Sequence, residues 1–161
     1  MLIRKPKVYL DTSVISHLMQ EDVPEKMAIT QELWKMFRAG EYDIYLSIVT
    51  TGELMDCPEP KRSGLMQYLD EIQYALLPVT DETVTLANKI IDMGVLTRKS
   101  FDDSRHIAAA LIGDCDCIVS WNFKHLVNIR TIHGVRAIAN LEGYRPIDIV
   151  SPETLLEGDY E

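Results

Sequence analysis

Oxygen-donating side chains recur in this sequence where apolar segments give way to polar ones. They are Asp11, Glu53, Asp102, Asp103 and Asn122. Carboxylate and amide oxygens without a matching set of His and Cys ligands suit Mg²⁺ or Mn²⁺, which keep several waters and are usually completed by phosphate oxygens of a substrate. Such a cation lowers the pKa of a bound water and neutralises the charge that builds up when a phosphodiester is cleaved. These residue types therefore predict a phosphodiester-cleaving metal site, if the fold brings them together.

The elements that would position these residues are predicted from apolar runs and helical periodicity. Runs rich in apolar and β-branched residues predict strands at 8–10, 44–49, 75–79, 117–121 and 147–150. Apolar residues at helical spacing predict helices over 24–38, 81–93 and 103–112. Asp22 with Glu25 is predicted to form a capping box. Glycines stand where these helices would end, at Gly40, Gly94 and Gly113.

The alternation of strands and helices predicts an α/β protein whose mostly parallel sheet is covered by helices on both faces. Ligands of such sheets bind beyond the carboxyl ends of the strands. Asp11 and Asn122 directly follow predicted strands, so the topology can bring the scattered oxygen donors to one edge of the sheet. We expect a single domain over residues 1–150 and a short acidic tail, 151–161, with a short helix and a frayed end.

Composition limits the class of protein. The 161 residues, 47% apolar and 25% charged, suit one globular domain that folds without disulfides or a structural metal. The formal net charge of −9 counts against broad nonspecific binding of nucleic acids, for which a basic surface is usual. It does not exclude a nuclease, because acids around a divalent cation invert the local field and a basic partner protein can supply positive surface.

The sequence carries no recognisable export or membrane segment. The apolar run near the N-terminus is broken by Asp11, and nowhere do about 18 apolar residues follow one another. Cys57, Cys115 and Cys117 lack the paired spacing of a zinc site and are expected to be reduced thiols. We therefore expect a soluble cytoplasmic protein.

Most of the candidate residues also have a structural explanation when each is considered alone. Asp102 or Asp103 could cap a helix, and Asn122 could hold a turn. Glu53 could be a solvated helix residue favoured by the helix dipole. Asp11 is harder to explain in this way, because an aspartate directly after a buried apolar strand needs charged or hydrogen-bonding partners.

Four segments resemble, in order, the four motif regions of the PIN domain family: KVYLDTSVIS, SIVTTGEL, FDDSRHIAAA and CIVSWNFKHL. They are most similar to the VapC-like toxin ribonucleases of type II toxin–antitoxin pairs. The resemblance spans about residues 7–150 and implies a three-layer α/β/α sandwich with a mostly parallel central sheet. It also implies Mg²⁺- or Mn²⁺-dependent cleavage of single-stranded or loop RNA.

The same resemblance implies roles for single residues. Asp11, Glu53 and Asp103 match the three motif acids and are the candidate catalytic residues and metal ligands. Asp103 is preferred to Asp102 because the small and apolar residues that follow it fit the family pattern, and Asp102 is an alternative ligand. Asn122 stands where many members carry aspartate, and its neutral oxygen would hold a metal more weakly.

Other side chains near these motifs are candidates for positioning a substrate. Hydroxyls that could orient a carboxylate or phosphate, or make only local hydrogen bonds, belong to Thr12, Ser13 and Ser120. Basic side chains that could contact RNA phosphate, or lie in solvated loops, belong to Arg98, Lys99, Lys124 and His125. His106 follows Asp103 by three residues on the predicted helix and could face the site or be structural.

The leading hypothesis is a metal-dependent endoribonuclease that acts as a toxin. The alternative is a catalytically inactive PIN-like scaffold that binds protein or RNA. A phosphatase-like or phosphoacceptor domain with Asp11 as nucleophile is disfavoured, because Ser13 stands where a second aspartate would be needed. The resemblance also implies a small antitoxin partner and a homodimer. The net charge of −9 suggests that the antitoxin is basic, and we expect no membrane partner.

Overall fold

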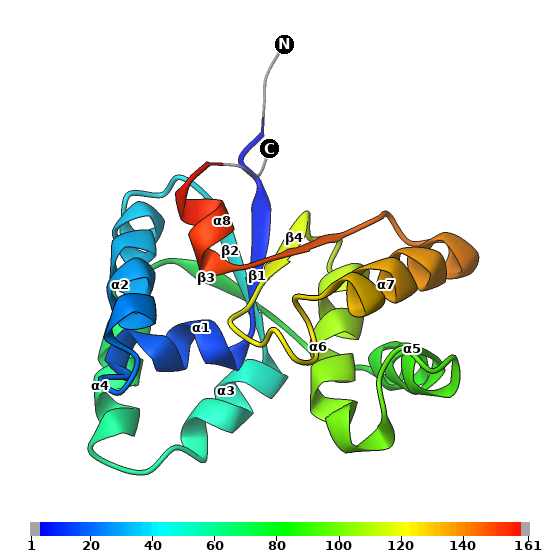
Figure 1. Cartoon of the computed structure of the whole chain (residues 1–161), viewed down its shortest axis with the longest axis horizontal. Helices are drawn as coiled ribbons and strands as arrows, with labels where there is room; N and C mark the ends of the chain where they lie inside the picture. The colour runs from blue at the N-terminus through cyan, green and yellow to red at the C-terminus, as the bar shows by residue number, and fades with distance from the viewer. Residues whose placement is uncertain (1–3, 159–161) are drawn as a thin grey trace.

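A parallel five-stranded sheet forms the middle layer of this computed structural model, which describes residues 4–158 (Figure 1). Its strands are β1 (Lys7–Leu10), β2 (Asp43–Ser47), β3 (Tyr74–Leu77), β4 (Cys117–Val119) and β5 (Asp148–Val150). Their order is β3-β2-β1-β4-β5, and every neighbouring pair is parallel. The central strands β1 and β4 are almost fully buried, as expected for a parallel sheet covered on both faces.

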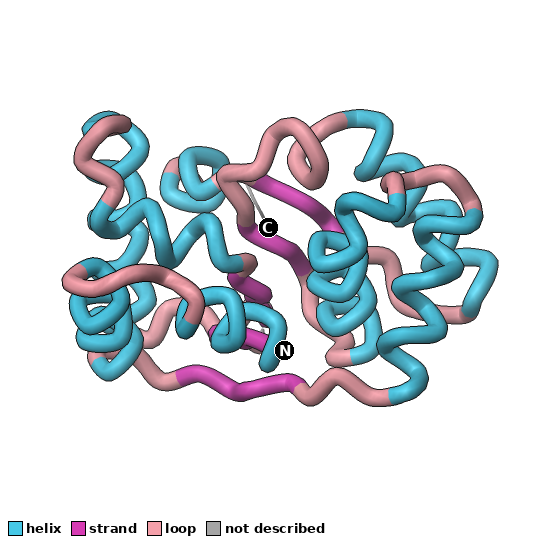
Figure 2. The backbone as a smooth tube through the Cα atoms, turned by 90° about the horizontal axis from the view of Figure 1, so that it is seen from below, coloured by secondary structure: helices cyan, strands magenta, loops and turns pink. Residues whose placement is uncertain are grey.

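Helices cover both faces of the sheet (Figure 2). On one face lie α1 (Thr12–Ser16), α2 (Pro24–Arg38), α3 (Ile48–Met55), α4 (Lys61–Asp70) and α8 (Pro152–Leu156). On the other lie α5 (Asp81–Asp92), α6 (Phe101–Ile112) and α7 (Ile129–Glu142). Short 3₁₀ turns, η1 (His17–Met19) and η2 (Arg98–Ser100), follow α1 and precede α6. The predicted α/β sandwich is confirmed.

The order of the strands fixes where a ligand site can form. From β1 the chain adds β2 and β3 on one side, with α1 to α4 as crossovers, and then returns through α5 and α6 to place β4 on the other side of β1. The crossovers therefore leave the carboxyl ends of β1 and β4 in opposite directions. Such a switch point leaves a crevice at the sheet edge, where ligands of open α/β sheets bind.

Two hydrophobic cores, one on each face, hold the helices to the sheet. Trp34 and Phe37 of α2 are buried on one face together with Leu155 of α8. Both aromatic side chains of α2 therefore belong to this core, and the short helix expected in the C-terminal tail packs into it. The opposite core joins Ile118 of β4 to Ile107 of α6 and its neighbours. The expected frayed end lies partly outside the described residues, at 159–161.

Some predicted element boundaries are wrong for local reasons. Ile48 and Val49 belong to α3 and not to the preceding strand, because the Ser47 hydroxyl accepts a hydrogen bond from Val49 N at 3.1 Å and starts the helix. The strand predicted at 117–121 ends at Val119. The helix predicted over 103–112 begins two residues earlier, at Phe101.

Two predicted helix caps are also wrong. The Asp22 carboxylate accepts a hydrogen bond from Gln20 Nε2, and α2 begins at Pro24 without a side-chain cap. Gly113 has a right-handed φ of −73°, and the left-handed residue at the end of α6 is Asp114, with φ 58°. Periodicity also fails to predict α1, α4 and α7. Within residues 4–158 no helix combines the length and apolar character needed to cross a bilayer.

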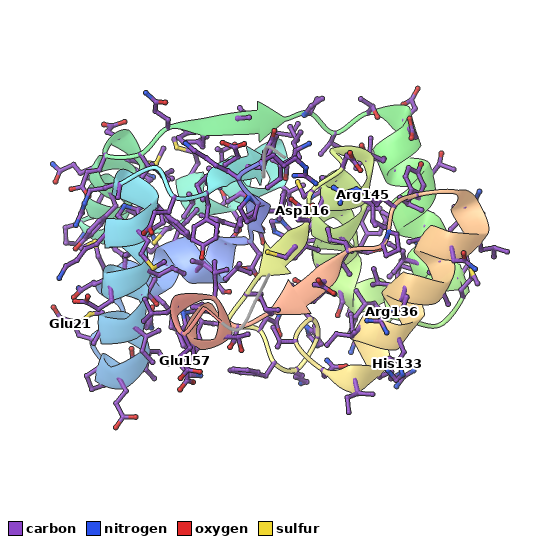
Figure 3. The ribbon with its side chains drawn as sticks, turned by 90° about the horizontal axis from the view of Figure 1, so that it is seen from above. Glu21, Asp116, His133, Arg136, Arg145 and Glu157 are labelled. Carbon is purple, nitrogen blue, oxygen red and sulfur yellow. The ribbon has the colours of Figure 1, made fainter. Side chains whose placement is uncertain are left out.

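Asp116 joins three segments at the amino-terminal edge of the sheet. Its carboxylate accepts hydrogen bonds of 2.7 Å from the backbone N–H of Lys7, from Arg4 and from Arg145. Figure 3 shows Asp116 and Arg145 side by side next to the start of β4. Partial burial alone would raise the pKa of Asp116, but these hydrogen bonds outweigh it and hold the pKa well below the ordinary value.

We predict that Asp116→Asn lowers the free energy of unfolding at pH 7 by about 1–3 kcal/mol, the typical worth of charged hydrogen bonds. Because the folded-state pKa is lowered, the stabilisation is present above the ordinary value of 3.8 and is lost as pH falls below it. Denaturant unfolding between pH 3 and pH 8 should therefore show a difference that shrinks in acid. Asp148→Asn is the control, since its exposed carboxylate makes no described hydrogen bond; equal losses in both variants would contradict the assignment.

Candidate active site

Asp11 lies at the carboxyl end of β1, at the switch point of the sheet, and is only 3% exposed. The hydroxyls of Ser13 and Ser120 each donate to its carboxylate at 2.6 Å, from α1 and from the end of β4. The backbone N–H of Val14 also donates to it, which makes Asp11 the N-cap of α1. All these donors are neutral, so the negative charge of Asp11 has no cationic hydrogen-bonding partner.

Glu53 lies on α3, and two side chains hold its carboxylate. Thr12, the residue after Asp11, donates its hydroxyl to Glu53 Oε1 at 2.7 Å. The Nε2 atom of His106 lies 2.6 Å from the same oxygen. No described hydrogen bond engages Glu53 Oε2. Glu53 therefore presents one free oxygen while the other is fixed.

Asp103 completes the group of carboxylates from α6. Its Oδ2 atom lies 3.1 Å from Nδ1 of His125, and its Oδ1 has no described hydrogen bond. Asp11 is close enough to Asp103 to raise its pKa. Asp102 is exposed instead and pairs with Arg105 at 2.6 Å on the outer side of α6. The structure thus places Asp103, and not Asp102, beside the other acids.

Asn122 and the predicted Arg and Lys residues make no described contact with the three acids. The Asn122 side-chain oxygen accepts a hydrogen bond from His125 N at 2.9 Å, so its described role is to shape the loop after β4. Arg98 contacts Asn88 and Asp92 on the surface. Exposed side chains without a described contact to the three acids are those of Arg98, Lys99 and Lys124.

His106 is the common neighbour of the three acids. It is 2% exposed, and its Nδ1 atom lies 2.6 Å from the hydroxyl of Tyr9 in the middle of β1. That hydroxyl also contacts Ser47 at 2.7 Å, so the imidazole is fixed from the sheet side. Sequence reasoning left His106 undecided between facing the site and a structural role, and it missed Tyr9. The sequence indicates this contact only in that Tyr9 lies two positions before Asp11, in the predicted strand that Asp11 follows.

The environments of the three carboxyl groups differ. Burial raises the pKa of Asp11, and the nearby imidazole of His106 and the serine hydroxyls oppose this only in part. Burial also raises the pKa of Asp103, against the effects of His106 and His125. At Glu53 burial is outweighed by the hydrogen bond to His106, which lowers the pKa. At Asp11 and Asp103 the effect of burial on the pKa thus exceeds the opposing effect of the hydroxyl and histidine partners.

These oxygens fit a hard divalent cation in composition. Asp11 is a buried carboxylate without a cationic hydrogen-bonding partner, and Glu53 and Asp103 each have one uncommitted oxygen. Among residues 4–158, however, no three His, Cys, Asp or Glu side chains converge on one point in the geometry of a metal site. This arrangement suits Mg²⁺, which binds through one or two carboxylates and completes its shell with waters and substrate phosphate.

An aromatic and basic surface borders the site on the loop after β4. Phe123 is 45% exposed, and Lys26 lies 5.3 Å above the centre of its ring. Trp121 packs edge-on against Phe123 and also contacts the ring of His17. The backbone N–H of Trp121 donates to the Ser13 hydroxyl, which ties this surface to Asp11 through one side chain.

Comparison with known proteins finds likeness only at the level of structure, since no family model and no curated protein matches the sequence. A chain of VapBC2 from Rickettsia felis, solved bound to a DNA fragment from their promoter, superposes with a TM-score of 0.55 and 10% identity. That match covers 90% of this chain and 98% of the other. A chain of VapBC-5 from Mycobacterium tuberculosis, from the VapBC family of toxin–antitoxin systems, gives a TM-score of 0.48 and 17% identity over the same shares. The first match shows that this chain shares its fold with a chain of VapBC2.

We predict that His106→Ala lowers the free energy of unfolding by about 2–3 kcal/mol, because it leaves a cavity and removes one of the hydrogen-bonding partners of the buried Tyr9 hydroxyl. Denaturant titration would measure the loss. His133→Ala is the matched control, because His133 lies on the outer side of α7 in Figure 3 and is exposed. A His106 variant as stable as the control variant would show that the imidazole does not hold the site together.

Proposed function

We propose that this chain is a Mg²⁺- or Mn²⁺-dependent endoribonuclease and acts as the toxin of a toxin–antitoxin pair. The observation that carries the proposal is the buried Asp11 carboxylate at the switch point of the sheet, which has only neutral hydrogen-bond donors. Asp103 is close enough to interact with it electrostatically, and Thr12, the residue after Asp11, holds Glu53. The VapC-like fold supports this choice among the reactions that a divalent cation can assist. The cytoplasmic location expected from the sequence belongs to the same proposal.

The cation would be held by Asp11, and the uncommitted oxygens of Glu53 and Asp103 would bind it directly or accept hydrogen bonds from its waters. When bound, it lowers the pKa of a water and neutralises the charge that builds up on the scissile phosphate. The protein contributes orientation. Ser13 and Ser120 fix both oxygens of Asp11, and the histidines fix one oxygen of each other acid, so the free oxygens are presented without loss of side-chain freedom on binding.

Unpaired RNA is the substrate class that the neighbouring surface supports. An exposed aromatic ring beside a lysine can stack on a base while the ammonium approaches the backbone, and stacking is available only to bases that are not paired. Phe123 and Lys26 provide this pair, and Trp121 in the same loop is linked to Asp11 through the Ser13 hydroxyl. The chain is acidic overall, so such local positive charge is what an RNA strand would meet.

A basic antitoxin and a second copy of this chain are the partners we propose. The net charge of −9 and the cluster of three acids favour a basic partner. Ile48 and Met55 of α3 are 47% and 53% exposed and lie on the same helix as Glu53, where a partner could cover them. A native mass that reports only monomer would contradict the homodimer.

We predict that the purified chain cuts a mixed single-stranded RNA pool with Mn²⁺ or Mg²⁺ and not with EDTA. Asp11→Asn and Asp103→Asn should each slow cleavage at least about a hundredfold, since loss of one preorganised charge contact commonly costs that much. Gel analysis of the products would measure the rates. The matched control is Asp102→Asn, which removes the neighbouring exposed carboxylate and should retain activity.

Two results would contradict the nuclease proposal. Cleavage that survives in Asp11→Asn, or that persists in EDTA, would place the chemistry elsewhere. An inert wild-type chain that also binds no Mn²⁺ would favour the alternative of a catalytically inactive scaffold.

The aromatic surface gives a separate prediction. Phe123→Ala should weaken binding of a single-stranded RNA about fivefold to a hundredfold, the range measured for stacking of one base on an aromatic side chain. Fluorescence anisotropy in EDTA would measure affinity without cleavage. Leu141→Ala, which removes another exposed apolar side chain at the far end of α7, should bind like the wild type. Equal affinities for all three proteins would exclude the stacking role.

A further inference from the structure

A small cavity lies on the other side of the loop that carries Phe123. It has a volume of about 130 Å³ and lies between the segment before α6 and the start of α7. Its lining residues are Val95, Leu96, Thr97, Ser100, Lys124, His125, Asn128, Arg130 and Thr131. The volume equals roughly four liquid waters at about 30 Å³ each, so the cavity suits a small ion and not a whole nucleotide.

The lining of this cavity is basic. Three of its residues are Lys124, His125 and Arg130, and none is an acid, although the chain as a whole carries a net charge of −9. Lys124 and Arg130 form no described ion pair, and the guanidinium of Arg130 donates to the Gly94 carbonyl at 3.1 Å. The charges of Lys124 and Arg130 are therefore not paired with carboxylates of the described residues, whereas His125 lies against Asp103.

Uncommitted hydrogen-bond donors also line the cavity. Ser100 is 6% exposed, yet its hydroxyl makes no described hydrogen bond and does not cap α6. The hydroxyl of Thr97 is likewise without a described partner. The cavity also reaches the first turn of α7, where backbone N–H groups lack helical partners and the helix dipole favours an anion. Ser100 thus adds a largely buried residue with a hydroxyl to the basic lining of the cavity, and a hydroxyl can donate a hydrogen bond to an anion.

His125 connects this cavity to the candidate active site. His125 is one of the residues that line the cavity, and its Nδ1 atom lies 3.1 Å from Asp103 Oδ2. An anion in the cavity would thus lie next to a residue that contacts one of the three acids. Two successive phosphates of one RNA strand would lie close together in this way, one at the acids and one in the cavity. A free anion has no such link to the acids.

We propose that this cavity binds a backbone phosphate of the RNA, adjacent to the phosphate that is cleaved. The inference rests on the proposed function and assigns part of its substrate binding to Lys124, Arg130 and Ser100. It accounts for how a chain of net charge −9 holds a polyanion, because the positive contacts are concentrated at the loop after β4.

The test is the affinity of the full chain for a fluorescent single-stranded RNA, measured by anisotropy in EDTA at several NaCl concentrations. Lys124→Ala and Arg130→Ala should each weaken binding about fivefold or more, and each should reduce the slope of log affinity against log salt by about 0.7. Both residues are exposed, so neither variant removes core packing. Arg136→Ala is the control, since it deletes the same charge from the outer side of the same helix (Figure 3).

The outcomes separate the cavity from its alternatives. Equal affinities in all four proteins, or equal losses in the three variants, would overturn the proposal in favour of no role or of nonspecific charge. Calorimetry with inorganic phosphate is the second measurement. If phosphate binds the wild type and not Arg130→Ala while both proteins bind RNA equally well, the cavity binds a free anion. That result would also overturn the proposal.

Cleavage assays keep this inference distinct from the proposed activity. A wild-type chain that cuts RNA while the cavity variants bind it normally would contradict the cavity and leave the nuclease standing. A chain that needs Lys124 and Arg130 to bind RNA but cuts none would support the cavity and contradict the nuclease.

Discussion

The carboxylate of Asp11 is buried at the end of the central strand, and no positively charged side chain is hydrogen-bonded to it. Burying a charge among neutral groups costs free energy. Hydrogen bonds from the surrounding structure or a bound cation must offset that cost. Two serine hydroxyls reach it from different elements, Ser13 from α1 and Ser120 from the end of β4. The position of Asp11 thus depends on the parallel pairing of β1 with β4, and the acidity of the site depends on Asp11.

Two histidines organise the other acids around this centre. His106 links the buried Tyr9 hydroxyl to Glu53, and His125 links Asp103 to a basic cavity at the start of α7. Each imidazole fixes one carboxylate oxygen and leaves the other uncommitted. The site therefore combines a rigid protein side with oxygens that remain available. A basic and aromatic border beside the acids then offers an RNA strand local attraction within an acidic protein.

Sequence patterns predict the parallel sheet and the acid at the end of its first strand, because buried strands and helical periodicity are local signals. They prefer Asp103 over Asp102 by the small residues that follow it, and Asp103 lies beside Asp11. They cannot predict the contact between Tyr9 and His106, which are 97 positions apart and meet only through packing. They also miss the start of α3, because one hydrogen bond to Ser47 overrides the strand preference of the next residues.

We propose that Asp11, with Glu53 and Asp103 on neighbouring elements, forms a site for a divalent cation at the carboxyl edge of the sheet. Calorimetric titration of Mn²⁺ into the full chain without RNA tests it most directly, with Asp11→Asn and Asp102→Asn measured beside the wild type. We expect saturable binding to the wild type and to Asp102→Asn, and loss of that binding in Asp11→Asn. Binding that is absent from the wild type, or unchanged in Asp11→Asn, would contradict it.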